Sequence, residues 1–467
     1  MIVIQMPPQE KRPSDASASS ESEPTTMKES CNNHNHNPKH TKSFIHPTTS
    51  LPLLIMIDNF AVSLVVPLLY QYYQDAGVAS ASLRELLSSL FSSSQIVGAL
   101  VMGALSDSGI LTRKHILYMS FLGSALSYSL IVYGGVGGLI LSRVIVGAVK
   151  QTGTISTSMI STYTTPQERA RHMGRLSACS TGAFIIGPSV GAFLYKHVDK
   201  RAPAILASIL FILNFFLAAM LLPNEKSFKK EQKPNMSSSS SSKNKFASFA
   251  QNLKSCFTSK QLSAVVISTL VYHWILRATS YTSMASYYEE MFSIEPHQRG
   301  YLASYQSVIS FIFQTFFVQS TLHYVGGEYR AACTAACAVA IATVLELGSS
   351  LHLFLIVICP IVAVANSTLS LSLRSLLTQI APKESLGSIL AAVDVLQNCA
   401  SVTVPFYRTL LFRILACTTE EDSNAAMRGD PCPRMWLKLS LLHWIVATIV
   451  MSRLLLNQSD KSKSKEV

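Results

Sequence analysis

The sequence predicts an all-α membrane protein with twelve transmembrane helices in two pseudo-repeated six-helix bundles. The first observation is composition, because the 467 residues are 49% hydrophobic and only 14% charged, with a mean hydropathy of +0.31. Soluble proteins carry about 25% charged residues, so most of this chain does not face water. The second is a series of apolar segments of about 20 residues, the length of a membrane-spanning helix. The third is an internal similarity between the two halves.

The apolar segments divide the chain into five regions. Residues 1–48 are rich in Ser, Pro, Lys and His without an apolar period, which predicts a disordered cytoplasmic tail. The two helical bundles are 49–222 and 261–456, joined by a Ser- and Lys-rich cytoplasmic linker at 223–260 and followed by a tail at 457–467. The expected transmembrane segments are 50–73, 86–106, 114–134, 137–163, 172–195, 202–222, 261–288, 298–321, 330–350, 352–380, 386–412 and 435–456.

The distribution of Lys and Arg predicts the orientation, because basic residues concentrate in short cytoplasmic loops. With the N-terminus inside, the strongly basic central linker also falls inside, so both termini are expected in the cytoplasm. The net charge of +12 does not indicate nucleic-acid binding, because the Lys and Arg lie mainly between the apolar segments and in the tails. We expect a monomer whose partners are the lipid bilayer and a small-molecule solute.

The two halves repeat a turn and a proline at almost one spacing. Pro166–Glu168 follows the fourth segment and resembles Pro382–Glu384 after the tenth, an offset of 216 residues. Pro188 in the fifth segment and Pro405 in the eleventh are offset by 217 residues. Proline is common at helix ends, so coincidence is the alternative. A parallel duplication of six helices is a known transporter plan that places the solute site between the halves.

Asp58 is the first charged residue inside an apolar segment. It lies about eight residues into the first helix, or about 12 Å deep at 1.5 Å per residue. Such a carboxyl is costly unless it faces a polar interior, and burial favours its protonated form. Asp58 can therefore bind a proton in one conformation and release it in another, or bind a cationic solute. The structural alternative is a bond to the backbone or to Asn59.

Arg143, Gly147 and Lys150 recur at i, i+4 and i+7, which places them on one face of the fourth helix, and Thr154 continues that face. We expect this polar stripe to line the cavity. Arg143 would pair with Asp58 or transmit its protonation to the solute site, and Lys150 would bind an anionic group. A satisfied structural ion pair is the alternative.

The second half carries three further candidates. His273 and Arg277 share a face of the seventh helix, and an imidazole can carry a proton near neutral pH. A packing role for His273 is the alternative. Asp394 lies about eight residues inside the eleventh helix, counted from its expected start at residue 386. The candidate substrate- or proton-binding residues are thus Asp58, Arg143, Lys150, His273, Arg277 and Asp394.

The segment Gly103–Lys114, between the second and third helices, resembles the first signature of the major facilitator superfamily. That signature forms a cytoplasmic gate from a Gly, an Asp, a second Gly and a basic pair. The matching residues differ from the pattern because Ser108 replaces a basic residue and the basic pair comes late. The resemblance implies a gating role for Gly103, Asp107, Gly109, Arg113 and Lys114.

Two more segments resemble the same superfamily. Arg143 followed by Gly147 resembles its helix 4 signature, and Asp58 with Pro67 resembles helix 1 of the tetracycline-resistance-like drug:proton antiporters. A third, finer resemblance over Lys150–Thr152 and the Pro166 turn is to an orphan vertebrate-type member of unassigned substrate, so it adds no chemistry.

The fifth segment resembles the helix 5 signature of the antiporter branch. The match includes Gly182, Gly187, Pro188 and Gly191, whereas Ala192 replaces a further glycine. Small residues allow close helix contacts, so we expect Gly187, Pro188 and Gly191 to let helix 5 approach the other half and act as a pivot. Gly182, and Gly147 of the fourth helix, are expected in the same set of packing and pivot residues.

The resemblance covers roughly residues 50 to 456 and implies the major facilitator fold. It implies a secondary active transporter that moves a small organic solute by alternating access, coupled to protons. A facilitative or anion transporter and a non-transporting scaffold or receptor are the alternatives. No G-x-x-x-x-G-K-[ST] loop and no convergent catalytic cluster occur in the sequence, so we expect neither an enzyme nor a cofactor.

Two further groups of residues have the chemistry of a binding or bonding site. Cys31, His34, His36 and His40 can ligate a metal, but a low-complexity tail is the simpler interpretation, so no metal site is predicted. Cys417 and Cys432, both near the loop before the twelfth helix, are candidates for a disulfide.

Overall fold

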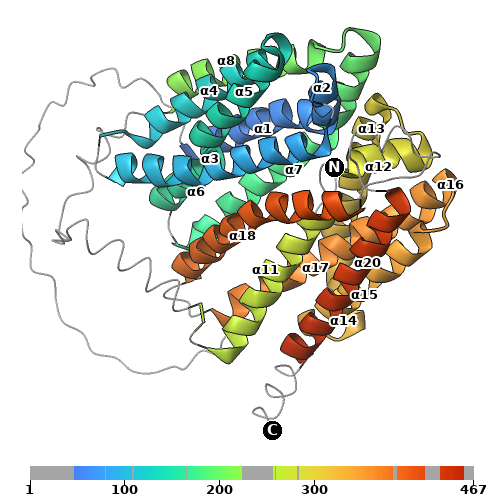
Figure 1. Ribbon diagram of the computed structural model, residues 1–467. Helices are drawn as coiled ribbons and strands as arrows, with labels where there is room; N and C mark the ends of the chain where they lie inside the picture. Colours follow the sequence, from blue (N-terminus) through green and yellow to red (C-terminus); the bar gives the residue numbers. More distant parts are fainter. Residues whose placement is uncertain are drawn as a thin grey trace, which may run out of the picture. The chain divides into compact units, whose positions relative to one another are not determined.

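The structure is a computed structural model in which the chain divides into two units, Met1–Ser43 and Phe44–Val467. The first unit, nearly all of the expected linker and the C-terminal tail lie outside the described residues. Every regular element of the part that is described is a helix, which confirms the predicted all-α class (Figure 1). The described residues are 47–78, 80–107, 110–164, 166–222, 256–257, 259–280, 283–381, 386–415 and 432–456.

The first half contains the helices drawn from blue to green in Figure 1. Its elements are α1 (Pro47–Val65), η1 (Val66–Leu68), α2 (Leu69–Asp75), α3 (Ala81–Asp107), α4 (Arg113–Tyr133), α5 (Gly135–Val149), α6 (Thr152–Tyr163), α7 (Pro166–His197) and α8 (Ala202–Leu221).

The second half contains the helices drawn from yellow-green to red (Figure 1). Its elements are α11 (Lys260–Ser280), α12 (Ser283–Phe292), α13 (Pro296–Ile312), η2 (Phe313–Phe317), α14 (Val318–Val325), α15 (Glu328–Glu346), α16 (Leu351–Leu353), η3 (Phe354–Ile358), α17 (Cys359–Ile380), α18 (Leu386–Leu415), α20 (Pro433–Met451) and η5 (Ser452–Leu456).

Ten runs of helix among the described residues are long and apolar enough to cross a membrane. They match ten of the expected segments. The fourth segment was predicted as one helix over 137–163, and this is wrong because α5 ends at Val149 and α6 begins at Thr152. The eleventh segment forms the long helix α18, whose sequence includes Asp394 and Arg408 among apolar residues.

The seventh segment also differs from its prediction. One helix was expected over 261–288, whereas α11 ends at Ser280 and a separate helix, α12, begins at Ser283. The sequence around this boundary is a run of Ser, Thr and Tyr, from Thr279 to Ser283. Hydroxyl side chains compete for backbone hydrogen bonds and lower helix stability, which explains a boundary inside an apolar segment.

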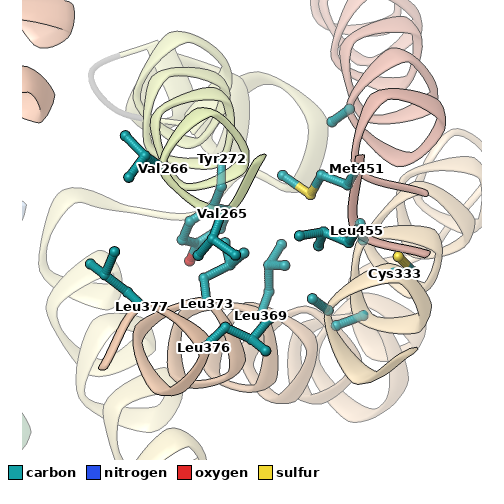
Figure 2. Packing of buried hydrophobic residues seen from close by; sticks show 14 of the residues in the cluster. Val265, Val266, Tyr272, Cys333, Leu369, Leu373, Leu376, Leu377, Met451 and Leu455 are labelled. Carbon is teal, nitrogen blue, oxygen red and sulfur yellow. The ribbon is translucent and has the colours of Figure 1, made fainter. Parts of the chain in front are cut away.

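Each half has its own apolar core. In the first half, Leu54 and Leu64 of α1, Phe121 of α4 and Phe211 of α8 are fully or almost fully buried in one cluster. In the second half, Figure 2 shows the corresponding cluster, where side chains of α11, α15, α17 and α20 converge. Cores confined to one half allow the halves to move as bodies against each other.

The two halves meet along α7 with α13 and along α3 with α18. Gly300 of α13 lies so close to α7 that an added Cβ would meet the Pro188 carbonyl and the side chain of Ala192. The Ser189 N–H donates to Ser304 Oγ at 3.0 Å across the same contact. A glycine and small side chains therefore permit this close helix contact.

Candidate functional site

A cavity of about 1100 Å³ lies against the first half and is completed by α17 and α18 of the second. Its walls come mainly from α1, α3, α5, α6 and α7, and they combine apolar and aromatic side chains with a small polar set. The charged residues that line it are Asp58, Arg143, Lys150, Arg374 and Asp394. Four of the six predicted binding residues therefore share one cavity.

Asp58 and Lys150 form an ion pair in the cavity wall. Lys150 Nζ donates to Asp58 Oδ1 at 2.9 Å, and the Lys150 and Asp58 side chains are 20% and 4% exposed, respectively. Thr152 Oγ1 lies 3.4 Å from the same carboxylate oxygen as a second donor. The sequence analysis considered an ion pair between Asp58 and Arg143. This is wrong, because the cation paired with the Asp58 carboxylate is Lys150.

Neighbouring helices hold this pair in position. Ser120 Oγ of α4 and Thr152 Oγ1 share a hydrogen bond of 2.8 Å, which fixes the start of α6. Lys150 Nζ lies 4.7 Å from the centre of the Phe211 ring of α8, a cation–π contact. The ammonium group therefore has a second favourable environment besides the carboxylate.

The interruption between α5 and α6 is the second feature of the site. Lys150 has φ −75° and ψ 84°, outside the helical region, and the next helix starts without a side-chain cap. The sequence contains a local signal for this break, because Thr152, Gly153 and Thr154 are poor helix formers in succession. All three line the cavity.

Arg143 lines the cavity without a carboxylate partner among the described residues. Its Nε lies 3.4 Å from Ser142 Oγ, and its guanidinium carbon lies 5.9 Å from the centre of the Tyr73 ring. The side chain is half-buried. A guanidinium in this position can offer several N–H donors to a bound group.

The second half contributes Arg374 of α17 and Asp394 of α18 to the cavity. Asp394 is thus placed as expected from the sequence, with its side chain exposed. His273 and Arg277 of α11 are not among the residues that line this cavity. The centres of the His273 and Tyr272 rings lie 5.0 Å apart, so His273 contacts its neighbour in the sequence, and its role as a proton carrier stays a prediction.

A buried ion pair that the sequence analysis missed joins the halves. Arg408 Nη2 of α18 lies 3.1 Å from Glu85 Oε1 of α3, and the side chains are 2% and 1% exposed. Ala81, Phe412 and Trp436 form an apolar cluster beside it. The available signal was that Arg408 lies within an expected apolar segment and Glu85 directly before one, but nothing local indicates which two charges pair.

Other contacts across the halves lie at the same end of the helices. Arg299 of α13 lies over the Tyr70 ring of the first half at 5.2 Å, and it is held by a hydrogen bond to Glu289 of its own half at 2.8 Å. Lys196 Nζ and His297 Nε2 are 3.2 Å apart. We call this set of contacts, together with Glu85–Arg408, the closed end.

The cavity extends from the closed end toward the other end of the helices. On α7 the cavity is lined by residues from Met173 to Ser180, whereas Lys196 lies near the opposite end of that helix. On α18 the lining runs from Asp394 to Cys399, and Arg408 follows two to three turns later. The halves are therefore in contact at one end of the cavity.

The expected gate segment is only partly described. Gly109 and the side chain of Asp107 lie outside the described residues, and Gly103 is exposed with open space where a Cβ would point. Arg113 begins α4. Lys114 is buried and donates to the carbonyls of Ala219, at 3.2 Å, and Leu222, so it caps the end of α8.

The small residues of α7 differ in which helix they contact. Gly187 and Gly191 face α1, where an added Cβ would overlap Ser63 and the Leu64 backbone, respectively. Pro188 instead faces Gly300 of the other half. Gly182 has no atom within 4 Å of its added Cβ, so no close contact explains it.

Gly147 packs within the first half, against α3. An added Cβ would lie 2.6 Å from the Ser94 Cβ and 2.7 Å from the Phe91 carbonyl, both on α3. The glycine therefore allows α5 to lie directly on α3.

No group of three potential metal ligands occurs in the described part of the chain, and the His-rich tail with Cys31, His34, His36 and His40 falls outside it. Cys432 is disulfide-bonded. Cys417 lies outside the described residues, so its pairing with Cys432 stays a prediction.

Comparison with known proteins agrees with this fold. Residues 51–405 match the model of the Major Facilitator Superfamily. The class C tetracycline resistance protein of Escherichia coli is 30% identical over 183 residues, which are 38% of this chain and 45% of that protein. The quinolone resistance protein NorA of Staphylococcus aureus is 30% identical over 176 residues, 37% of this chain and 44% of that protein. The matched stretch thus spans less than half of either relative.

Solved structures show the same fold at low sequence identity. The human organic anion transporter MFSD10 (TETRAN) has a TM-score of 0.58 at 18% identity, and the match covers 86% of this chain and 99% of that one. The nucleoside transporter NupG has a TM-score of 0.66 at 9% identity, covering 88% and 99%. The family match and the ten apolar helices among the described residues lead to one conclusion: this integral, multi-pass membrane protein belongs to the Major Facilitator Superfamily.

Proposed function

We propose that the protein is a secondary active transporter that couples the movement of a small organic solute to protons by alternating access. The observation that carries this proposal is the Asp58–Lys150 ion pair in the wall of the cavity. Because this carboxyl lies in the wall of the cavity that would hold the solute, proton binding to it can be linked to solute binding.

Asp58 is the proposed proton carrier. Proton binding would neutralise the carboxylate and remove its attraction for Lys150, which retains its contact with the Phe211 ring. Thr152, the second donor to Asp58, opens α6, so a change at the carboxyl acts directly on the interrupted helix. The charge state of one side chain would thereby bias the geometry of the cavity wall.

The closed end supports the alternating-access part of the proposal. A second conformation open at that end requires the buried Glu85–Arg408 pair and the contact between Gly300 and Pro188 to separate. The two separate cores permit such rocking of the halves. With the orientation expected from the basic loops, the cavity would face the cytoplasm.

The proteins that resemble this chain are named for small organic compounds, which supports a small organic solute here. The matched proteins include tetracycline and quinolone resistance proteins, and the similar structures include an organic anion transporter and a nucleoside transporter. The imperfect gate signature is the feature that favours the non-transporting alternative.

Uptake into proteoliposomes that contain the purified chain tests this function. A panel of organic cations, anions and neutral solutes is offered with an imposed pH gradient in each direction and with none. We expect one solute class whose uptake rate rises with one direction of the gradient and falls with the other. Uptake that is equal under all three conditions contradicts proton coupling, and no flux in any class favours a scaffold.

A further inference from the structure

A second cavity, of about 510 Å³, lies within the second half between α11, α18 and α20. Most of its wall is aliphatic, and no Lys, Arg, Asp or Glu side chain is among its described lining residues. It shares none of those residues with the cavity that contains Asp58. Leu442 and Val446 line it and are 56% and 48% exposed, so it opens onto the apolar outer face of a membrane-spanning helix, which the bilayer covers.

The internal repeat explains why space remains between these helices. In the first half, Gly187 and Gly191 let α7 lie directly on α1. The offset of 217 residues between the repeated prolines places Val404 and Arg408 at the corresponding positions of α18. Without those glycines, α18 contacts α11 less extensively than α7 contacts α1, which leaves room for another molecule.

Three polar aromatic residues meet in the wall of this second cavity: Trp274 of α11, Tyr407 of α18 and His443 of α20. The centre of the Tyr407 ring lies 4.8 Å from that of Trp274 and 5.6 Å from that of His443. His443 lies nine residues, or about 14 Å, after Arg434, where the candidate span of α20 begins. The group is therefore near the middle of a hydrocarbon core of about 30 Å, where polar side chains are costly and usually functional.

The hydrogen-bond donors of this group are all in use. His443 Nδ1 lies 2.7 Å from the Leu439 carbonyl oxygen, which only accepts, so Nδ1 carries the proton and Nε2 accepts the Tyr407 hydroxyl proton. Trp274 Nε1 donates to Thr403 Oγ1 at 2.9 Å. The Tyr407 oxygen keeps an acceptor lone pair to which no described residue donates. The cavity thus offers a ligand an acceptor and no free donor.

We propose that this cavity binds a neutral alcohol or phenol dissolved in the bilayer, whose hydroxyl donates to the Tyr407 oxygen and whose apolar body fills the space between the helices. A hydroxyl in hydrocarbon has no other partner, so this hydrogen bond favours the cavity over the bilayer core. An organic anion or a ketone brings only acceptors, which find no free donor here. The site is separate from the cavity proposed for the solute and goes beyond the proposed transport function.

The probes para-phenylphenol and its methyl ether share one apolar body, but only the phenol has a hydroxyl donor. The full chain in nanodiscs is heated with a concentration series of each probe at neutral pH, where the phenol is uncharged. We expect the phenol to raise the melting temperature in a saturable way, because a ligand stabilises the state that binds it. Half of the maximal shift should need about tenfold less phenol than ether, which equals about 1.4 kcal/mol. Equal dependence on the two probes, or no saturable shift with the phenol, overturns the proposal.

Two variants place the effect at this cavity. In Tyr407→Phe the acceptor is absent, so the phenol and the ether should act at the same concentration. Val446→Phe fills the cavity and should raise the phenol concentration for half of the maximal shift at least about tenfold. Its added ring starts from an exposed position, so its ligand-free melting temperature should stay close to that of the wild type. A preference for the phenol that persists in Tyr407→Phe, or unchanged phenol dependence in Val446→Phe, contradicts the site.

Val344→Phe is the matched control, because Val344 of α15 is 50% exposed, as Val446 nearly is, and does not line the cavity. Its phenol dependence should stay within about twofold of the wild type, since a distant site acts independently. A tenfold loss there as well shows a general effect of an added ring on the bilayer-facing surface and contradicts the site.

Discussion

Lys150 is both the residue that interrupts the fourth transmembrane segment and the partner of Asp58, at 2.9 Å. As the C-cap of α5, its cation also lies at the negative end of that helix dipole, where a positive charge is favoured. One residue thus connects the buried carboxylate of α1 to the break in the cavity wall. Contacts of this kind can each be tested with purified protein.

Lys150→Gln should lower the free energy of unfolding by about 3 kcal/mol at neutral pH, because it leaves the buried Asp58 carboxylate without a cation. The double variant Asp58→Asn/Lys150→Gln is the control, because it also replaces the carboxylate with a neutral amide and should recover most of the lost stability. Thermal unfolding of the wild type and both variants at neutral pH measures the difference. A loss in the double variant as large as in the single one would sink this explanation.

Glu85→Gln should weaken the closed end. It leaves the Arg408 guanidinium buried against a neutral amide, and breaking such a buried pair costs about 3–5 kcal/mol. We expect the population to shift toward a conformation open at this end, which increases labelling of a cysteine placed at Ala81, beside the pair. The charge-swapped variant Glu85→Arg/Arg408→Glu should recover part of the protection. Labelling identical to the wild type would show that the pair does not hold this end closed.

Gly191→Ala should destabilise the first half by about 1–3 kcal/mol, because the added methyl group meets the backbone of Leu64 in α1, which cannot move aside as a side chain can. Gly182→Ala, on the same helix, adds its methyl group to open space and serves as the control. Melting temperatures in detergent compare the two. Equal effects would contradict the close contact of α7 with α1.

Lys114→Gln should lower stability by about 1.5–3 kcal/mol, because it removes charged hydrogen bonds to the Ala219 and Leu222 carbonyls at the end of α8. Lys200→Gln, an exposed lysine between α7 and α8, should change stability by less than about 0.5 kcal/mol. Thermal unfolding measures both. If Lys114→Gln leaves the melting temperature unchanged but alters transport, the gating role inferred from the family signature describes it better than a cap.

Most of the helices could be predicted from the sequence because hydropathy is a local property of each segment. The face shared by Arg143 and Lys150 followed from helical periodicity, and both residues line the cavity. The partner of Asp58 could not be predicted, because Lys150 lies 92 residues away and its position depends on a break without proline. Gly153 and its threonine neighbours were the local signal for that break.

The contacts between the two halves could not be predicted from the sequence. Glu85 and Arg408 are both charges near apolar segments, but only the packing of α3 on α18 brings them together. The glycines of α7 were expected to approach the other half, and only the register of the helix shows that Gly191 meets α1 while Pro188 meets Gly300. Which face of a small-residue helix meets which neighbour is a property of the whole fold.

Asp58→Asn compared in two transport assays tests the central claim, that Asp58 couples solute movement to protons. Solute counterflow at equal pH needs no net proton movement, whereas gradient-driven uptake does. We predict that Asp58→Asn retains counterflow and loses the response to the pH gradient, while Asp75→Asn, an exposed carboxyl at the end of α2, retains both. Gradient-driven uptake by Asp58→Asn at the wild-type rate would contradict the account.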